Sequence, residues 1–343
     1  MKSTLSYFRL PMTATVIGIV AIAWFGFATT GSTAGALKFL LIGITLTLLE
    51  ISLSFDNAVV NANKLKYMSP LWQQRFLTWG ILVAVFGMRI VFPIVIVSLA
   101  AGIGPIDATV LAATEPDTYS HIMHEAHVSI AAFGGTYLMM VALSFFVDTE
   151  KNVDWIRFVE TRLRACADLR AIEVVFVLCL IVGFTLAQSD GQETEFLFAA
   201  VLGLLAFLLV EVLGDVLDKG QTNAAVASGG LGAFLYLEVL DASFSFDGVI
   251  GAFALTSNMF LIAVGLGIGA FYVRSMTIML VDRDTLSQLR FLEHGAFYSV
   301  LALSIIMLTQ SVIEVPEYVT GPLSIAFIAL ATLSSVRYAK RYC

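Results

Sequence analysis

Long apolar segments recur along almost the whole chain and are separated by short polar stretches. Ten of these segments are close to the roughly 20 residues that an α-helix needs to cross a bilayer. Because the segments are continuously apolar and do not alternate with polar residues, they are typical of membrane helices and not of barrel strands. The pattern therefore predicts an all-α, polytopic membrane protein. We expect its transmembrane helices near 11–30, 36–62, 74–101, 124–147, 171–188, 196–217, 224–256, 257–281, 291–313 and 317–338.

The composition agrees with this prediction. The chain has 343 residues, of which 59% are hydrophobic and 13% are charged, whereas about a quarter of the residues in soluble domains are charged. No stretch is left for a sizeable soluble domain. The three cysteines are scattered along the chain without a CxxC pair, so they indicate neither a disulfide framework nor a zinc site.

The basic residues predict the orientation of the helices. Most of the 19 lysines and arginines fall in the two terminal segments and in the loops near 63–73, 148–170, 218–223 and 282–290. Because cytoplasmic loops carry the excess of Lys and Arg, both termini are expected in the cytoplasm. The N-terminal segment also resembles the start of a signal peptide, cleavable near Ala34, but we expect the first helix to be retained.

One short polar motif occurs twice inside apolar segments. It reads EISLSFDN at 50–57 and DASFSFDG at 241–248, so both copies share the order acid-x-Ser-x-Ser-Phe-Asp. The segment that follows each copy carries a single arginine, Arg89 in the first half and Arg274 in the second. One copy would be weak support, but two copies in corresponding segments indicate an internal duplication.

The duplication predicts two three-helix repeats. Equivalent helices of the two repeats are an odd number of spans apart, so we expect the repeats to cross the membrane in opposite orientations. Inverted repeats of this kind place substrate sites near the midplane, where the repeats meet. The acids of each motif fall on different helical faces, so we expect the motif helices to be discontinuous or bent. The predicted organisation is a first transmembrane helix (1–35), repeat A (36–148), a cytoplasmic connector with two linking helices (149–223), repeat B (224–314), and a last helix with a cytoplasmic tail (315–343).

Ionisable groups at mid-membrane are energetically costly and are functional candidates for that reason. Carboxylates, hydroxyls and an amide are hard oxygen ligands, which suit magnesium, calcium and manganese, and neither motif contains Cys or His. The alternative is that the acids pair with the two arginines only to fix the bundle. The candidate metal ligands are Glu50, Ser54, Asp56, Asn57, Glu238, Asp241, Ser245 and Asp247, with Arg89 and Arg274 as counter-charges.

Three other polar stretches have an ordinary interpretation beside a functional one. His121, His124 and Glu125 share one helical face and could bind a metal, or could form an ordinary interfacial loop. The acids within 211–218 either end a solvated helix or form a metal vestibule. The polar stretch 148–170 predicts an amphipathic cytoplasmic helix or a solvated connector.

Two stretches, LLEISLSFDNAVVNA and LEVLDASFSFDGVIGAFA, resemble the paired acidic motifs of TerC-like integral membrane proteins. This family lies in the lysine-exporter-like superfamily, and the nearest branch is a bacterial one catalogued as a domain of unknown function. The resemblance covers roughly residues 36–314, while the extra helices and Gly248 depart from the family pattern. It implies inverted three-helix repeats, the bacterial inner (cytoplasmic) membrane and, from characterised members, manganese export. The resemblance also implies that the functional residues of the family motif correspond to Glu50, Asp56, Asn57, Asp241 and Asp247.

The leading hypothesis is a transporter that exports a divalent metal cation, manganese first, through the mid-membrane carboxylates and in exchange for protons. The alternatives are a membrane-protein assembly or scaffold factor and, less favoured, an intramembrane aspartyl hydrolase, whose usual GxGD motif this chain lacks. We therefore expect no enzymatic activity, and the divalent ion is a substrate and not a resident cofactor. The expected partners are the metal ion and the lipid bilayer, without nucleic acid, and a homo-oligomer stays open.

Overall fold

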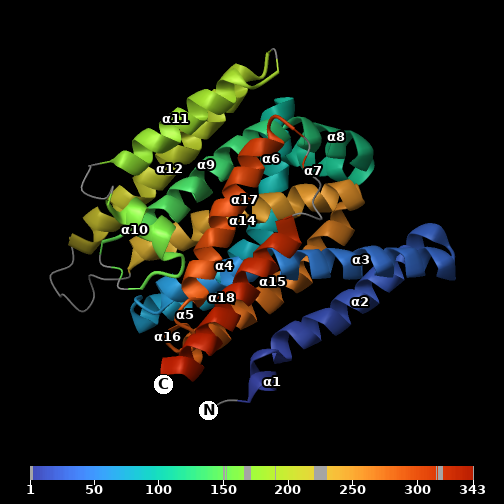
Figure 1. Cartoon of the computed structure of the whole chain (residues 1–343). Helices are drawn as coiled ribbons and strands as arrows, with labels where there is room; N and C mark the ends of the chain where they lie inside the picture. Colours follow the sequence, from blue (N-terminus) through green and yellow to red (C-terminus); the bar gives the residue numbers. More distant parts are fainter. Residues whose placement is uncertain are drawn as a thin grey trace. The chain divides into compact units, whose positions relative to one another are not determined.

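The computed structural model describes residues 3–149, 151, 153–165, 171–189, 191–219, 230–313, 315 and 320–342. In this part of the chain the regular secondary structure is helical, with no strand, as the apolar pattern predicts (Figure 1). The chain divides into two compact units, each of which combines segments far apart in the sequence. Unit 1 consists of Met1–Ser54, Gln74–His127 and Phe244–Met279, and unit 2 of Phe55–Gln73, Val128–Ser243 and Leu280–Cys343.

Eight helical segments within the described residues are long and apolar enough to cross a membrane, so the chain is a multi-pass membrane protein. The two remaining expected helices are present but are not among these eight spans. Helix α11 (Ile172–Leu186) has 15 residues, and α14 (Leu231–Leu255) carries the acids Glu238, Asp241 and Asp247. The eight candidate spans are Arg9–Thr30, Thr33–Leu53, Pro70–Ala101, His127–Val147, Glu193–Leu213, Met259–Asp282, Leu292–Gln310 and Pro322–Arg341.

In unit 1, the short helix α1 (Thr4–Tyr7) precedes a hairpin of two long helices, α2 (Arg9–Thr30) and α3 (Thr33–Leu53), which pack against each other (Figure 1). Gly31 ends α2 with a φ of 64°, a left-handed conformation that glycine adopts without strain. The Ser32 hydroxyl then caps α3 by accepting a hydrogen bond from a backbone N–H of the first turn, at 3.0 Å. The tight turn fixes the start of α3, whose last turn carries Glu50.

The second stretch of unit 1 begins at Gln74 within α5, whose first residues belong to unit 2. In this stretch α6 packs against α7 and α8, which both begin with a proline in the first turn. The segment η1 is π-helical and carries Arg89. Such segments are frequent at functional sites. The bounds are α5 (Pro70–Leu82), η1 (Val83–Val91), α6 (Phe92–Ala101), α7 (Pro105–Thr114) and α8 (Pro116–Glu125).

In unit 2, α4 packs against α17 and α18, which also pack against each other, and α11 packs against α12 (Figure 1). Small residues allow the close approach of α17 and α18, because a Cβ on Gly295 would lie 2.4 Å from the Cβ of Ala331. The helices of this unit, besides α11, are α4 (Phe55–Leu65), α9 (His127–Val147), α10 (Arg157–Ala165), α12 (Glu193–Lys219), α16 (Thr285–Gln288), α17 (Leu292–Gln310) and α18 (Thr320–Tyr342).

The two motif copies differ in backbone structure. The first copy is interrupted, as predicted, because α3 ends at Leu53, Ser54 has φ −100° and ψ 14°, and α4 begins at Phe55. The second copy corrects the prediction of a break, since α14 is helical without interruption from Leu231 to Leu255. The first serines of the two copies behave alike, because the Ser52 hydroxyl donates to the Leu49 carbonyl (2.9 Å) and the Ser243 hydroxyl to the Val239 carbonyl (3.0 Å). At the interruption, the Ser54 hydroxyl donates to the Glu50 carboxylate (2.9 Å).

Candidate functional site

Glu50 is part of a buried ion pair in unit 1. It lies in the last turn of α3 and is 2% exposed. Its Oε1 accepts a hydrogen bond from the Ser54 hydroxyl at 2.9 Å and another from the guanidinium of Arg89, which is also buried. In such a pair each charge compensates the other, and removal of one partner leaves an uncompensated charge in a low-dielectric interior.

Two glycines make room for the Glu50 side chain. A Cβ on Gly269 of α15 (Met259–Asp282) would lie 2.5 Å from the Cβ and Cγ of Glu50, and a Cβ on Gly248 of α14 would lie 3.2 Å from its Oε2. Gly248 belongs to the second motif, so the carboxylate of the first motif lies beside the second motif within unit 1. This close approach leaves little room for a side chain at position 248.

Asp56 is wholly buried in unit 2, with an exposed fraction of 0%, in the first turn of α4. Its Oδ2 accepts a hydrogen bond from the Ser299 hydroxyl of α17 at 2.7 Å and lies 3.3 Å from the Ser324 hydroxyl of α18. Its Oδ1 accepts from the backbone N–H of Asn57 at 2.9 Å. These partners are neutral, and the positive end of the α4 dipole supplies only a partial charge. A cation or a proton would therefore stabilise the site further.

Asp241 contacts α4, the helix that carries the second half of the first motif, within unit 2. It is 8% exposed on α14, and its Oδ1 accepts a hydrogen bond from the side-chain Nδ2 of Asn61 at 2.7 Å. Asn57 and Asn61 lie one turn apart on α4, both are buried, and their side-chain oxygens have no hydrogen-bond partner among the described residues. Buried amide oxygens without a donor are costly, and they are also good ligands for hard cations.

The other predicted site residues differ in how deeply they are buried. Ser245 is 5% exposed, and Glu238 is half-buried on α14. Arg274 is 5% exposed, and its guanidinium carbon lies 3.9 Å from the ring centroid of Phe76, a cation–π distance. The side chain of Asp247 lies outside the described residues. The role of the candidate ligands in metal binding therefore stays a prediction.

Within the described residues, no group of three or more His, Cys, Asp or Glu side chains is placed to hold a metal ion. Of the weaker candidates, His121 Nδ1 lies 3.4 Å from Glu125 Oε1, and both side chains are exposed. Among the acids of the suggested vestibule, the side chains of Asp215 and Asp218 lie outside the described residues. Both suggestions stay predictions.

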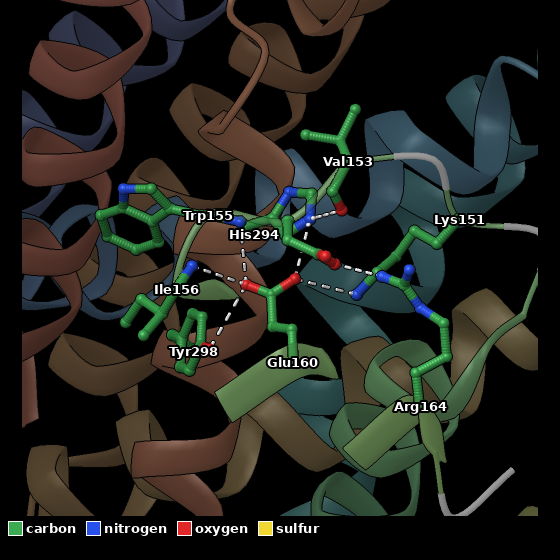
Figure 2. Close-up of polar contacts among 9 residues, drawn as sticks. Lys151, Val153, Trp155, Ile156, Glu160, Arg164, His294 and Tyr298 are labelled. Carbon is green, nitrogen blue, oxygen red and sulfur yellow. Dashed lines mark hydrogen bonds and ion pairs between the residues drawn. The ribbon is translucent and has the colours of Figure 1, made fainter. Parts of the chain in front are cut away.

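A second polar cluster joins the connector between α9 and α11 to helix α17 (Figure 2). We call it the Glu160 cluster, and its members are Lys151, Trp155, Ile156, Glu160, His294 and Tyr298. Glu160 of α10 is fully buried. Its Oε1 accepts hydrogen bonds from the backbone N–H groups of Trp155, at 3.1 Å, and Ile156, at 3.0 Å. The Tyr298 hydroxyl of α17 donates to the same oxygen at 3.3 Å. Three donors from two elements thus converge on one carboxylate oxygen.

The other carboxylate oxygen of Glu160 faces nitrogen atoms that can carry charge. Its Oε2 lies 3.2 Å from His294 Nε2 and 3.3 Å from Lys151 Nζ. His294 Nε2 also lies 2.8 Å from the Val153 carbonyl oxygen, so this nitrogen carries the proton. Burial alone raises the pKa of Glu160, but hydrogen bonds from His294 and the Ile156 N–H and the charges of His294 and Lys151 outweigh it, so the pKa falls from 4.5 to about 2.

Burial also lowers the pKa of Lys151, although the nearby Glu160 carboxylate acts in the opposite direction. The Lys151 ammonium lies 4.0 Å from the ring centroid of Phe145, which supplies a further favourable contact. Arg164 of α10 forms an ion pair with Asp154, and both of these charges also act on Lys151. The connector is therefore tied down by a compact group of compensating charges.

Several residues of these two clusters were not predicted from the sequence. Asn61 lies one turn after Asn57 on the same helical face, so a search for polar residues at helical spacing from the motif would have found it. Ser299 and Ser324 reach Asp56 from α17 and α18, and isolated serines in apolar helices give no local signal. Glu160 lies in the polar stretch expected to be an amphipathic helix, but nothing in its neighbours indicates a fully buried carboxylate.

A comparison with protein families gives a match over most of the chain. The family model described as "Protein of unknown function (DUF475)" matches residues 55–342. No curated protein and no solved structure matches the chain. The match starts at the first residue of α4, so it includes Asp56 and the second motif but not Glu50. Because the match covers far more than half of the chain, the protein belongs to the DUF475 family of proteins of unknown function.

Proposed function

We propose that this protein exports a divalent metal cation, with manganese as the first candidate, through carboxylates of its two motifs. The observation that carries the proposal is the wholly buried Asp56, whose hydrogen-bond partners are two serine hydroxyls and a backbone amide. A buried carboxylate surrounded by neutral groups is unstable unless it binds a cation or a proton. A transport site has to alternate between those two states.

The oxygen groups around Asp56 and Asp241 support a hard cation as the substrate. The side-chain oxygens of Asn57 and Asn61 are buried on α4, and Asn61 is hydrogen-bonded to Asp241. Carboxylate and amide oxygens are the ligands that magnesium, calcium and manganese prefer, whereas softer metals select sulfur or imidazole. Proton uptake by the carboxylates on one side of the membrane would release the metal, which makes proton exchange the proposed coupling.

We further propose ten transmembrane helices in two inverted repeats, with both termini in the cytoplasm of a bacterium and the chain in its inner membrane. Two contacts between the motif helices favour the repeat arrangement. Glu50 lies beside Gly248 within unit 1, and Asn61 binds Asp241 within unit 2. The motif resemblance to TerC-like proteins suggests the same arrangement and the same substrate.

A scaffold or assembly role is the second candidate, and the Glu50–Arg89 ion pair favours it. A buried pair of this kind fixes the relative position of α3 and η1 without any bound ion. A scaffold would need this pair but would have no need for the Asp56 charge. The two candidates therefore differ in how the protein responds to replacement of Asp56.

The test measures the manganese content of cells that have or lack the gene, grown with added manganese. A strain without the gene should accumulate manganese, the wild-type gene should restore the low level, and Asp56→Asn should fail to restore it despite normal membrane abundance. Parallel measurements of magnesium, calcium and zinc identify the ion. Equal metal content in all strains would reject the transporter and leave the scaffold role.

A further inference from the structure

The Glu160 cluster fastens the connector to the first turns of α17. Trp155, Ile156 and Lys151 contribute contacts from the connector, whereas the contacts of His294 and Tyr298 come from α17. His294 and Tyr298 are separated by one helical turn and therefore lie on the same face of α17. A single carboxylate thus holds two successive turns of this helix (Figure 2).

The same part of α17 reaches the candidate transport site. Tyr298 directly precedes Ser299, whose hydroxyl donates to Asp56 Oδ2 at 2.7 Å. Neighbouring residues of an α-helix differ by about 100° in direction and ~1.5 Å in height, so α17 presents Tyr298 to the connector and Ser299 to α4. A rotation or shift of α17 that breaks one of these contacts would also displace the other.

Aromatic packing makes this link stiff. The Tyr298 ring lies 4.6 Å from the ring of Phe146 on α9 and 5.7 Å from the ring of Trp155, measured between centroids. It also stacks on Phe327 of α18 at 6.1 Å. Phe327 lies one turn after Ser324, the second hydroxyl beside Asp56. The Tyr298 side chain, whose hydroxyl donates to Glu160, therefore belongs to the helix that supplies Ser299 and packs against the helix that supplies Ser324.

From this geometry we infer that Glu160 is a positioning residue for the Asp56 site, acting through Tyr298 to hold the Ser299 hydroxyl against the Asp56 carboxylate. The role in transport rests on the proposed function, whereas the mechanical link does not. Networks of buried polar groups specify one arrangement more sharply than apolar packing does, because a misplaced donor leaves a buried charge unsatisfied. The connector thereby influences ion binding at Asp56 without contacting the ion.

The test uses the full chain in proteoliposomes that contain a manganese-sensitive dye, with initial rates measured over a range of manganese concentrations. Tyr298→Phe removes only a hydroxyl, and Glu160→Gln removes the charge. Each is expected to lower transport at low manganese by about fivefold, and each should have little further effect when Ser299→Ala is already present. Such non-additivity is the signature of residues that act through one another.

Arg164→Gln is the matched control, because Arg164 belongs to the same connector but pairs with Asp154. Its effect should add to that of Ser299→Ala. If Tyr298→Phe and Glu160→Gln also add to Ser299→Ala, the positioning role is rejected and the cluster only stabilises the fold.

A second measurement separates failure of the inference from failure of the proposed function. Amide hydrogen exchange of residues 55–65 needs no transport, and Tyr298→Phe and Glu160→Gln should raise it at least about threefold, while Arg164→Gln leaves it unchanged. Faster exchange in a chain that moves no manganese would uphold the link and reject the transporter. Unchanged exchange in both variants would overturn the inference whatever the chain transports.

Discussion

Glu50 and Asp56 belong to the same short motif and are both buried, yet their surroundings differ. Glu50 in unit 1 is paired with Arg89, whereas Asp56 in unit 2 is hydrogen-bonded by Ser299, with Ser324 close by. An ion pair is neutral by itself, while a carboxylate among hydroxyls still needs a cation or a proton. The comparison suggests a division of roles, in which Glu50 holds helices together and Asp56 handles the ion.

Removal of the Arg89 charge should have the largest effect on stability. Arg89→Met leaves Glu50 buried without its cation, which typically costs about 3–5 kcal/mol of unfolding free energy. Thermal unfolding in detergent measures the loss. The double variant Glu50→Gln/Arg89→Met should recover at least half of it. If the double variant is as unstable as the single one, Glu50 does not depend on Arg89 and the comparison fails.

Glu160 extends the comparison to a buried carboxylate outside the spanning helices. Its pKa is lowered from 4.5 to about 2, so its stabilising contribution is complete above pH 4.5 and is lost as the pH falls toward 2. At pH 3 the loss relative to pH 7 should be about 2 kcal/mol. The unfolding temperature of the wild type should therefore fall across this window more steeply than that of Glu160→Gln. Parallel curves for both proteins would show that the carboxylate is not stabilised by its partners.

The hydroxyls around Asp56 should have a smaller effect. Ser299→Ala removes one hydrogen bond to a charged group, worth roughly 1.5 kcal/mol if Asp56 is ionised. If Asp56 is protonated in the resting protein, the loss falls below about 1 kcal/mol, because a neutral hydrogen bond is weaker. Unfolding measurements at pH 6 and pH 9 distinguish these states. Ser304 lies on the same helix as Ser299, and its hydroxyl donates to the Gly135 carbonyl of α9. Ser304→Ala is therefore the control and should show no change with pH.

Asp56→Asn should have the smallest effect on stability. The amide keeps an oxygen that can accept from Ser299, and no partner charge is left behind, so the unfolding free energy should change by less than about 1 kcal/mol. Glu50→Gln should cost more, because it leaves the Arg89 guanidinium without its carboxylate. Equal losses for the two variants would remove the proposed difference between the sites.

Most of the spanning helices could be predicted from the sequence, because a long apolar segment by itself indicates a helix that crosses a membrane. A carboxylate in such a segment is conspicuous, and Glu50, Asp56 and Asp241 are indeed buried, while their role in ion binding stays a prediction. The interruption at Ser54 was expected from the different faces of Glu50 and Asp56, yet the same reasoning failed for α14, which is helical without interruption. Ser52 and Ser243 both donate to carbonyls of their own helices, so these serines do not distinguish the two copies.

The partners of the buried acids were harder to predict. Ser299 and Ser324 come from helices remote in the sequence from Asp56, and their spacing carries no information about the contact. His294 likewise faces Glu160 from a helix that is remote in the sequence. Contacts of this kind depend on helix packing, which local hydrophobic periodicity does not specify.

Binding of manganese by the purified protein tests the central claim most directly. Electron paramagnetic resonance reports free manganese, so a titration in detergent at pH 7.5 counts the ions that the protein removes from solution. The proposed role of Asp56 predicts that the wild type and Arg164→Gln remove manganese in stoichiometric amounts, that magnesium or calcium competes more weakly, and that Asp56→Asn removes none while remaining folded. Equal removal by the wild type and Asp56→Asn, or no removal by either, would contradict it.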